Sequence, residues 1–431
     1  MKIIRANSSS FNEEIAPLLN RSSFDKEIDR SVAAILEDVK ARGDAALCDY
    51  AKKFDKAELT PAQFKVTEAE FAEAEQSIPE EVKVAIRTAR EHIVAFSSQK
   101  LPQDWSFSPR AGVTLGEKFT ALDSVGCYIP GGTAPLISTV IHTVAIAATA
   151  GVKEICVVTP PGKDGKVNPS VLFACKTAGA TAVYRLGGVY GVAALAYGTE
   201  TVPRVQKIVG PGNAYVTAAK RQLYGDVSLD LVAGPSEVMV LVDATSNPAF
   251  AAADLLSQAE HGSGREQAVL VSTDDAMLDA VAAELKRQSA LLSRAECVSK
   301  VLANGIFLIG AKDAAQAAEL ATLYAPEHLE IMMAEPRKVA ANVKAAGAIF
   351  LGPWTPEPVG DFVAGPSHVL PTGGSAHYFS GLTVDMFFRR TSLVEYSRDA
   401  LYSDLPHIAC FAKCEGLDGH GNSAAIRGKL I

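Results

Sequence analysis

Cysteine motifs and long apolar runs are missing from this sequence of 431 residues. Its seven cysteines include no C-x-x-C pair, which argues against a thiolate zinc site and against a disulfide framework. The most apolar run, residues 136–150, is interrupted by Thr139 and His142 among other polar residues and is too short to span a bilayer. Residues 1–10 are polar and lack the apolar core of a secretion signal. These absences favour a cytoplasmic protein with reduced thiols.

An excess of positive charge is also missing, since the formal net charge is -8. An acidic surface repels phosphate backbones and anionic lipid headgroups, so we expect neither nucleic acid nor a membrane as a partner. The G-x-G-x-x-G fingerprint of common dinucleotide sites is absent as well. The remaining composition, 48% apolar and 21% charged, is that of a globular protein, and the length favours more than one domain.

Periodicity divides the chain into a helical beginning and an alternating remainder. Residues 25–100 carry apolar side chains at helical spacing, such as Val32, Ile35 and Val39, and predict helices with a scaffold role. From Val125, short β-branched runs alternate with helical segments, which predicts two α/β domains with parallel sheets. The expected strands cover residues 126–130, 155–159, 182–186, 207–210, 238–242, 268–272, 306–309, 330–333 and 348–351.

Four glycine clusters occur where strands are expected to end. Such turns bring backbone N–H groups to the start of a helix, where they can hold an anion. Any one of them is more simply a tight turn, but four together favour a ligand cleft. The clusters are Pro130-Gly-Gly, Gly187-Gly188, Gly210-Pro-Gly-Asn213 and Gly234-Pro-Ser236.

Residues 254–262 carry the densest potential chemistry. Gln258 and His261 stand three residues apart near the end of an expected helix that Gly262 closes, so both side chains point the same way. An imidazole beside an amide oxygen is a reasonable half of a metal site. Taken alone, the pair is explained more simply as an exposed polar face.

The C-terminal third supplies further candidates. Residues 352–374 are dense in glycine and proline and include Asp361 and His368; loops of this length inside compact proteins are usually functional. Residues 382–431 predict an arm with little core of its own, which must pack on another domain or another subunit.

Taken together, several long motifs resemble the histidinol dehydrogenase family over nearly the whole chain. The resemblance implies two incomplete Rossmann-like domains with parallel sheets, a helical N-terminal part and a small C-terminal arm. The motifs are Tyr128-Ile-Pro-Gly-Gly-Thr-Ala-Pro, Gly210-Pro-Gly-Asn-Ala-Tyr-Val, Ala233-Gly-Pro-Ser-Glu, Ser257-Gln-Ala-Glu-His261, Ala325-Pro-Glu-His-Leu-Glu330, Gly360-Asp361 through Leu370-Pro-Thr-Gly-Gly, and Gly416-Leu-Asp-Gly-His420.

The same resemblance implies domain limits. Residues 1–24 would be an N-terminal extension, and residues 25–127 together with 235–381 a first α/β domain with the metal and substrate site. Residues 128–234 would form the second Rossmann-like domain with the NAD site, and residues 382–431 an arm exchanged between the subunits of a homodimer.

The resemblance also assigns roles to single residues. The implied zinc ligands are Gln258, His261, Asp361 and His420, the last reaching the site from the other subunit. The implied substrate contacts are these four ligands with Ser236, His328, His368 and Glu415. The implied NAD contacts are Tyr128, Tyr190 and Asn213, although Tyr190 stands where family members often have Gln. The implied catalytic residues are Glu327 and His328.

The implied reaction is a zinc-dependent four-electron oxidation of L-histidinol to L-histidine through histidinal, with two NAD, at the end of histidine biosynthesis. A neutral His328 would take the hydroxyl proton as hydride leaves, and the carboxylate of Glu327 would activate water for the second oxidation. Cys127 and Cys156 lie in apolar strand context without a basic partner, so we expect no covalent cysteine intermediate.

Three alternatives remain open at this point. A relative of the same fold could oxidise another small amino or sulfonated alcohol. A metal- and nucleotide-binding subunit without turnover is a second alternative, which the presence of Glu327 and His328 disfavours. A zinc hydrolase is a third, which the paired α/β domains disfavour.

Overall fold

The computed structural model describes residues 1–19, 21, 25–131, 135–261 and 264–428. Contacts divide the chain into two compact units, Met1–Lys100 with Leu122–Met386, and Leu101–Ala121 with Phe387–Ile431. We call them the catalytic unit and the arm unit. Among the helices within the described ranges, none is long and apolar enough to cross a membrane.

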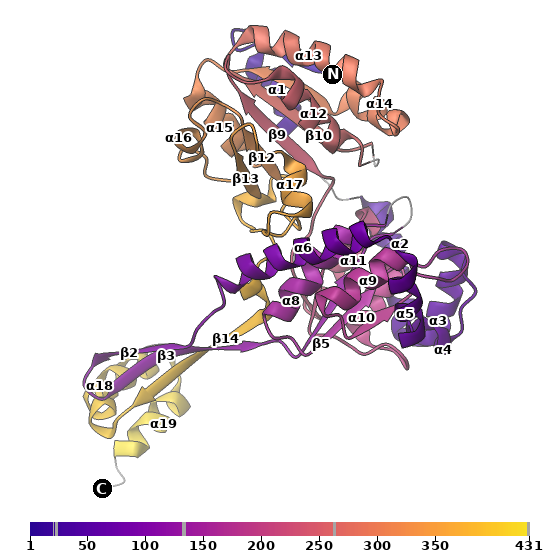
Figure 1. Ribbon diagram of the computed structural model, residues 1–431. Coiled ribbons are helices and arrows are strands. Elements are labelled where there is room, and N and C mark those ends of the chain that lie inside the picture. The colour runs from indigo at the N-terminus through magenta and orange to yellow at the C-terminus, as the bar shows by residue number, and fades with distance from the viewer. Residues whose placement is uncertain (20, 22–24, 132–134, 262–263, 429–431) are drawn as a thin grey trace. The chain divides into compact units, whose positions relative to one another are not determined.

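A five-stranded parallel sheet lies in the first half of the catalytic unit, as the alternating pattern predicted (Figure 1). Its order β6-β5-β4-β7-β8 reverses direction between β4 and β7, which is where ligands bind in sheets of this kind. The strands are β4 (Ser124–Tyr128), β5 (Glu154–Val158), β6 (Ala182–Tyr184), β7 (Lys207–Val209) and β8 (Ser228–Leu229). The helices between them are α7 (Ile137–Val140), η2 (Ile141–Ala145), α8 (Ile146–Thr149), α9 (Pro169–Ala178), α10 (Gly188–Tyr197) and α11 (Ala214–Gln222).

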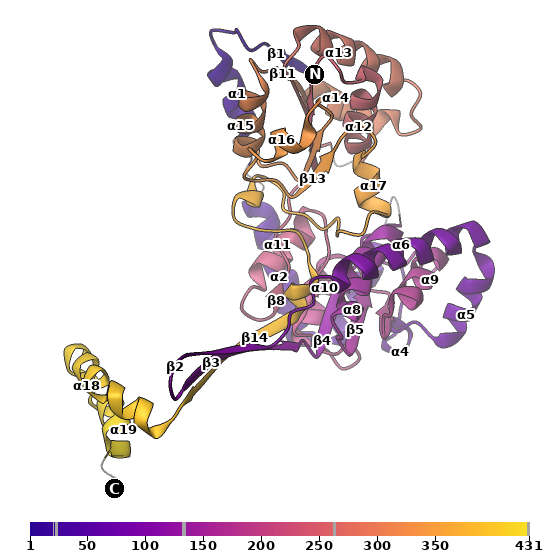
Figure 2. The same cartoon turned by 60° about the vertical axis from the view of Figure 1, so that its left-hand side comes forward.

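A six-stranded parallel sheet of order β1-β11-β10-β9-β12-β13 follows. Residues at the amino terminus add its edge strand β1, and Figure 2 shows β1 beside β11 and α1 beside α15. The strands are β1 (Lys2–Ile4), β9 (Glu237–Val242), β10 (Gln267–Ser272), β11 (Ile306–Gly310), β12 (His328–Ile331) and β13 (Ala348–Leu351). The helices are α1 (Phe11–Leu19), α12 (Pro248–Ala259), α13 (Asp275–Ser289), α14 (Ala295–Asn304), α15 (Ala314–Tyr324), α16 (Pro336–Ala340), α17 (Glu357–Phe362), η3 (Ser375–His377) and η4 (Val384–Phe387).

Strand β9 is buried on both faces, as a parallel sheet covered by helices requires. Val238 and Val240 pack in one core with residues of α12 and α13. Met239 and Leu241 point the other way and pack with residues of α1 and α15. Alternation along the strand therefore distributes its side chains between two cores.

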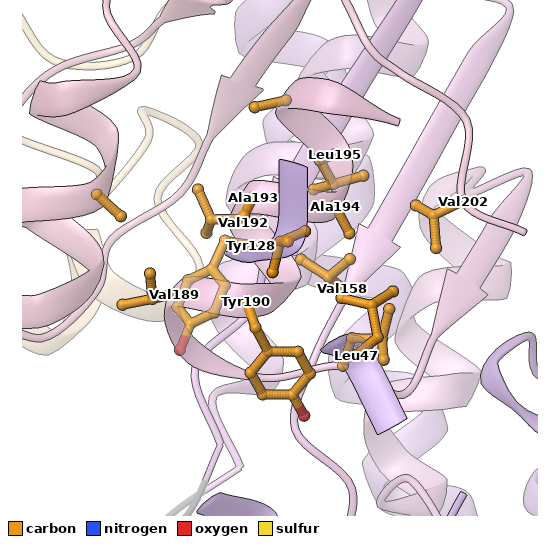
Figure 3. Close-up of a cluster of buried hydrophobic side chains, with 14 of the residues drawn as sticks. Leu47, Tyr128, Val158, Val189, Tyr190, Val192, Ala193, Ala194, Leu195 and Val202 are labelled. Atoms are coloured by element: carbon orange, nitrogen blue, oxygen red, sulfur yellow. The ribbon is translucent and has the colours of Figure 1, made fainter. Parts of the chain in front are cut away.

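The helical N-terminal part packs on the five-stranded sheet. Val32 and Val39 of α2 are buried in one core with Leu195 and Tyr128, part of which is drawn in Figure 3. The domain limits implied by the resemblance instead group residues 25–127 with the metal-bearing domain. An amphipathic face in the sequence reveals that it is buried but not what covers it. The helices are α2 (Lys26–Arg42), α3 (Asp44–Tyr50), η1 (Ala51–Asp55), α4 (Pro61–Phe64), α5 (Glu68–Ser77) and α6 (Glu80–Ser98).

The arm unit contains a three-stranded antiparallel sheet that the sequence analysis missed. Its order is β14-β3-β2, with β2 (Trp105–Arg110), β3 (Val113–Ala121) and β14 (Phe388–Tyr396), followed by α18 (Arg398–Glu415) and α19 (Asp418–Gly428) (Figure 1). The predicted arm, residues 382–431, lacks β2 and β3 because these strands are distant in sequence and join it only by pairing. Strand β2 is exposed along its whole length, so its sequence shows no inward-facing apolar alternation.

Candidate functional site

Predicted site residues gather at the amino edge of the six-stranded sheet. His328 is the first residue of β12 and pairs with Val238 at the start of β9, so Ser236 and Glu327 enter at the same edge. A helix that crosses between parallel strands runs opposite to them, which returns the end of α12, with Gln258, to this edge. The site thus lies beside the point where the strand order reverses between β9 and β12.

The backbone just before β12 has an unusual conformation. Helix α15 ends at Ala325, which has φ 48 and ψ 64. This left-handed conformation costs a non-glycine residue about 1–2 kcal/mol. Backbone N–H groups of the segment leading into β13 then donate to the carbonyls of Pro326 (2.8 Å) and Glu327 (2.9 Å). These contacts fix the position from which the Glu327 and His328 side chains leave the chain.

His328 is buried with its two ring nitrogens in different surroundings. Nδ1 lies 3.1 Å from the carbonyl oxygen of Glu237, so in a neutral ring Nδ1 carries the hydrogen and donates it. Nε2 then carries the lone pair. Within the described residues Nε2 makes no hydrogen bond of normal geometry, and Asp361 Oδ1 is 3.5 Å away. Nε2 is therefore the nitrogen that can accept a proton.

Three carboxylates surround this ring, those of Glu327 (3.8 Å), Glu357 (3.7 Å) and Asp361. Burial alone would lower the pKa of His328, but these charges outweigh it and raise that pKa well above its ordinary value. Burial would likewise raise the pKa of Asp361, but the adjacent His328 imidazole holds that pKa below the usual range. At the 3.5 Å separation of Nε2 and Oδ1, a protonated His328 and an ionised Asp361 attract each other and favour both charged forms.

Glu327 is buried beside His328 and anchored by one oxygen. Its Oε2 accepts a hydrogen bond of 2.9 Å from the N–H of Glu237. Burial raises the pKa of Glu327 to about 8, which is suitable for a group that takes and returns a proton near neutral pH. Behind it, the carboxylate of Glu237 is paired with Arg21 at 2.5 Å, and the Arg21 guanidinium covers the Tyr324 ring.

The arrangement of donor groups suits a divalent metal ion. Ligand atoms of His261, Glu357 and Asp361 all lie within 4.8 Å of one another. The side chain of Gln258 is fully buried, yet neither amide atom has a hydrogen-bond partner among the residues that the structure describes. An unpaired buried amide costs about 1–3 kcal/mol, which a bound cation would recover. Nitrogen and oxygen donors of this kind suit Zn²⁺.

Glu357 is a site residue that the sequence analysis missed. It is the first residue of α17 and stands four positions before Asp361, so the two carboxylates share a helix face. Its Oε2 accepts from the Ser257 hydroxyl at 2.8 Å, and its backbone N–H donates to Glu330 at 2.6 Å. Spacing could have revealed Glu357, but the surrounding prolines predicted a loop in place of a helix.

His368 and Ser236 are half-buried beside this cluster. The Nδ1 atom of His368 lies 3.0 Å from the Asp361 carbonyl oxygen and its Nε2 lies 3.2 Å from the Thr139 hydroxyl. The carbonyl of Ser236 accepts from the N–H of Gln267, which ties the start of β9 to β10.

Glu415 and His420 lie in the arm unit. Glu415 is the last residue of α18, His420 belongs to α19, and both are exposed. The arm unit by itself offers them none of the residues predicted to share their site. Their roles as a substrate contact and a metal ligand therefore remain predictions.

The predicted cofactor residues lie at the carboxyl edge of the five-stranded sheet. Tyr128 ends β4, and Gly210 follows the neighbouring strand β7. A Cβ on Gly210, which has φ +118, would meet the Tyr128 carbonyl oxygen at 2.3 Å, so the two segments approach closely only because Gly210 lacks one. Asn213 caps α11 by accepting from the N–H groups of Tyr215 and Val216. Both residues therefore lie at the edge of the sheet where the strand order reverses.

Tyr190 has a different environment. It is 1% exposed within α10, its hydroxyl donates to the Asp55 carboxylate, and its ring packs against Tyr50. Figure 3 shows it in the same apolar cluster as Tyr128. Such burial does not favour a direct contact with the cofactor, and that contact remains a prediction.

The cysteines near the strand ends are poor nucleophiles. Burial raises the pKa of Cys127 far above its ordinary value and that of Cys156 to about 11. Both thiols stay protonated near neutral pH, consistent with the expectation that neither forms a covalent intermediate.

Comparisons with known proteins agree with the motifs. The family model for histidinol dehydrogenase matches residues 19–428. Histidinol dehydrogenase from Heliobacterium mobile is 45% identical over 410 residues, covering 95% of this chain and 96% of that protein. The Bacillus subtilis (strain 168) enzyme is 44% identical over 402 residues, covering 93% of each. The crystal structure of histidinol dehydrogenase from Elizabethkingia anophelis superimposes with a TM-score of 0.94 at 34% identity, covering 100% of this chain and 98% of that one.

Proposed function

The chain belongs to the histidinol dehydrogenase family, and we propose that it oxidises L-histidinol to L-histidine through histidinal, as the final steps of histidine biosynthesis. Converting an alcohol to an acid removes four electrons. NAD, when bound, accepts two of them as one hydride, so each substrate molecule requires two NAD. The sheet edge at Tyr128 and Asn213 is the proposed cofactor site.

The observation that carries the proposal is that the two ring nitrogens of His328 have different surroundings. Its Nδ1 is committed to the Glu237 carbonyl, so Nε2 is the atom that accepts the substrate hydroxyl proton in the first oxidation. Glu327, with one oxygen fixed by the Glu237 N–H, then takes a proton from water as that water adds to the aldehyde. His328 accepts the hydroxyl proton of the hydrate in the second oxidation.

Gln258, His261 and Asp361 would hold the metal, with His420 of a second subunit as the fourth ligand, and Glu357 stands close enough to join them. When bound, Zn²⁺ supplies a Lewis acid that orients the nitrogen and oxygen donors of the amino alcohol. Ser236, His368 and Glu415 complete the proposed substrate contacts.

A homodimer with shared sites is the proposed assembly. Val394, Phe411 and Ile426 of the arm unit are 69%, 69% and 57% exposed, and α19 has no buried residue among those described. Large exposed side chains on a unit with so little core favour packing against a second copy. Such packing would bring Glu415 and His420 to the partner's metal cluster.

The proposed function is tested by incubating the purified, zinc-loaded protein with L-histidinol and NAD. We expect two NADH for each L-histidine formed. One NADH per substrate with accumulating aldehyde would contradict the four-electron reaction. Faster oxidation of another amino or sulfonated alcohol would instead support a relative of different specificity, the alternative left open by the motifs.

A further inference from the structure

His142 is a buried histidine that the proposed mechanism does not use. It lies in η2, a π-helical turn between α7 and α8, and its side chain is 0% exposed. A π-helical turn inside an α-helix is uncommon and often marks a functional region. The apolar sequence around it gives no reason to bury an imidazole, whose polar nitrogens cost free energy there.

His142 makes three contacts with residues 367–368. Its Nδ1 accepts the backbone N–H of His368 at 3.2 Å, and its carbonyl oxygen accepts the Ser367 hydroxyl at 3.0 Å. The imidazole rings of His142 and His368 stack with centroids 4.2 Å apart and planes 12° from parallel. The stack covers one face of the His368 ring with another flat, neutral ring.

The same helical segment also contacts the Nε2 atom of His368. Because Nδ1 of His368 donates to the Asp361 carbonyl, its Nε2 carries the lone pair and accepts from the Thr139 hydroxyl. Thr139 stands three residues before His142, on the same side of the helix. One face and both nitrogens of His368 are thus held, two of these three contacts coming from residues 139–142.

His142 itself retains one unsatisfied atom. Accepting at Nδ1 leaves its hydrogen on Nε2, which has no hydrogen-bond partner of normal geometry in the described part of the chain. The nearby carbonyls of Phe362 and Pro366 interact with the ring without completing such a bond. Burying a histidine with an unpaired nitrogen costs free energy. The contacts with His368 give a reason for a histidine at this position in spite of that cost.

We infer that His142, assisted by Thr139, is a positioning residue that sets the orientation of the His368 imidazole toward the substrate. This inference rests on the proposed substrate contact of His368. Residues 139–142 lie between β4 and β5 of the five-stranded sheet, whereas His368 follows α17 beside the metal cluster. The contact therefore also joins the proposed cofactor and metal sites within the catalytic unit.

The test is a double-mutant cycle with a matched pair of variants. His142→Phe keeps the stacking face and removes the acceptor, whereas His142→Asn keeps an acceptor and removes the ring. If both contacts position His368, each variant raises KM for L-histidinol by about three- to tenfold, while kcat stays within about twofold because the chemistry at His328 is untouched. Bound zinc, measured by mass spectrometry, stays at the wild-type level.

The decisive comparison uses the His368→Ala background. There His142→Phe should change KM by less than about twofold, because the group through which it acts is gone. An equal increase in both backgrounds, or a loss of zinc, would overturn the inference. If His142→Phe does not fold, Thr139→Val, which removes the other contact, is put through the same cycle. Failure of the wild-type protein to oxidise L-histidinol would reject the proposed function separately, before any variant is compared.

Discussion

Single residues of this site are tuned mainly by burial and by charge. His328 would be a weak base if burial acted alone, yet its carboxylate neighbours raise its pKa well above the ordinary value. A raised pKa means that His328 holds a proton at neutral pH. His328 must lose that proton before it can accept one from the substrate. A cation held by Asp361 and Glu357 would offset their negative charge and so lower the pKa of His328 toward the working range.

Removing one ligand tests the metal cluster directly. We expect His261→Ala to lower bound zinc at least about tenfold and to abolish turnover, because the remaining ligands bind more weakly. Zinc is measured by mass spectrometry after dialysis, and folding by circular dichroism. His377→Ala, which removes an exposed histidine whose ring is hydrogen-bonded to the Leu323 carbonyl, is the matched control and should keep both. Full zinc and full activity in His261→Ala would refute the ligand assignment.

The two oxidations should respond differently to loss of the Glu327 carboxylate. Glu327→Gln keeps an oxygen that can accept from the Glu237 N–H but cannot take a proton from water. We expect the oxidation of supplied histidinal to slow by about 10²–10⁴-fold, and the first oxidation of L-histidinol to slow much less. Single-turnover measurements of NADH for each step provide the comparison. Equal losses in both steps would assign Glu327 a general positioning role.

The raised pKa of Glu327 also predicts a pH dependence of stability. Because the folded-state pKa is about 8 and the ordinary value is 4.5, the folded protein binds the extra proton between these limits. Stability is therefore lost as pH rises through this window, by at most roughly 1.4 kcal/mol per pH unit. With zinc removed by a chelator, the melting temperature of Glu327→Gln should fall less than that of wild type between pH 5.5 and pH 8. Parallel curves would mean that Glu327 ionises normally.

At the scale of elements, the site residues come from the ends of two helices. Helix α12 presents Gln258 in its last turn, and the junction of α15 with β12 presents Glu327 and His328. The strained Ala325 at this junction is held by α15 on one side and by β13 on the other. Strain of this kind persists where the surrounding structure fixes the backbone.

Relieving that strain should offset the loss of a buried methyl group. Ala325→Gly removes a left-handed penalty of about 1–2 kcal/mol, adds an unfolded-state entropy cost of about 0.5–1 kcal/mol, and loses the burial of one methyl group, about 0.8 kcal/mol. We expect the free energy of unfolding, measured by urea denaturation, to stay within about 1 kcal/mol of wild type. The equally buried Ala321 in α15 has no such strain, so Ala321→Gly should lower stability by about 1.3–1.8 kcal/mol. An equal loss of stability in both variants would show that the Ala325 conformation is not strained.

At the scale of the whole molecule, the predicted site residues are distributed over both units. The catalytic unit carries Gln258, His261, Asp361 and the proposed catalytic pair, whereas Glu415 and His420 belong to the arm unit. The proposed two-fold dimer with exchanged arms would give each site ligands from both chains, and it would cover the exposed side chains of the arm.

Subunit mixing tests this division. Homodimers of His261→Ala and of His420→Ala have no intact site, whereas a mixed dimer has one site with both defects and one wild-type site. After unfolding and random reassembly of equal amounts, about half of the dimers are mixed, so roughly a quarter of wild-type activity should return. Each variant refolded alone provides the control and should stay inactive. An inactive mixture with verified mixed dimers would place His420 outside a shared site.

The sequence by itself determined the α/β class, because burial on both faces of a parallel strand leaves a run of apolar residues that is visible without coordinates. All nine strands expected between residues 126 and 351 are present, and the helical start from residue 25 to 100 is confirmed. Motif order likewise sufficed for the family, which the comparisons confirm. These features are local in sequence, and so they can be read from it.

Only the tertiary structure decided which distant segments meet. Pairing of β3 with β14 builds the arm unit from segments about 270 residues apart, and no periodicity encodes that choice. Glu357 joined the metal cluster because α17 packs beside α12, and His142 came to stack on His368 across a separation of 226 residues. Contacts of this kind depend on how whole elements pack, since a single side chain carries no record of its distant neighbour.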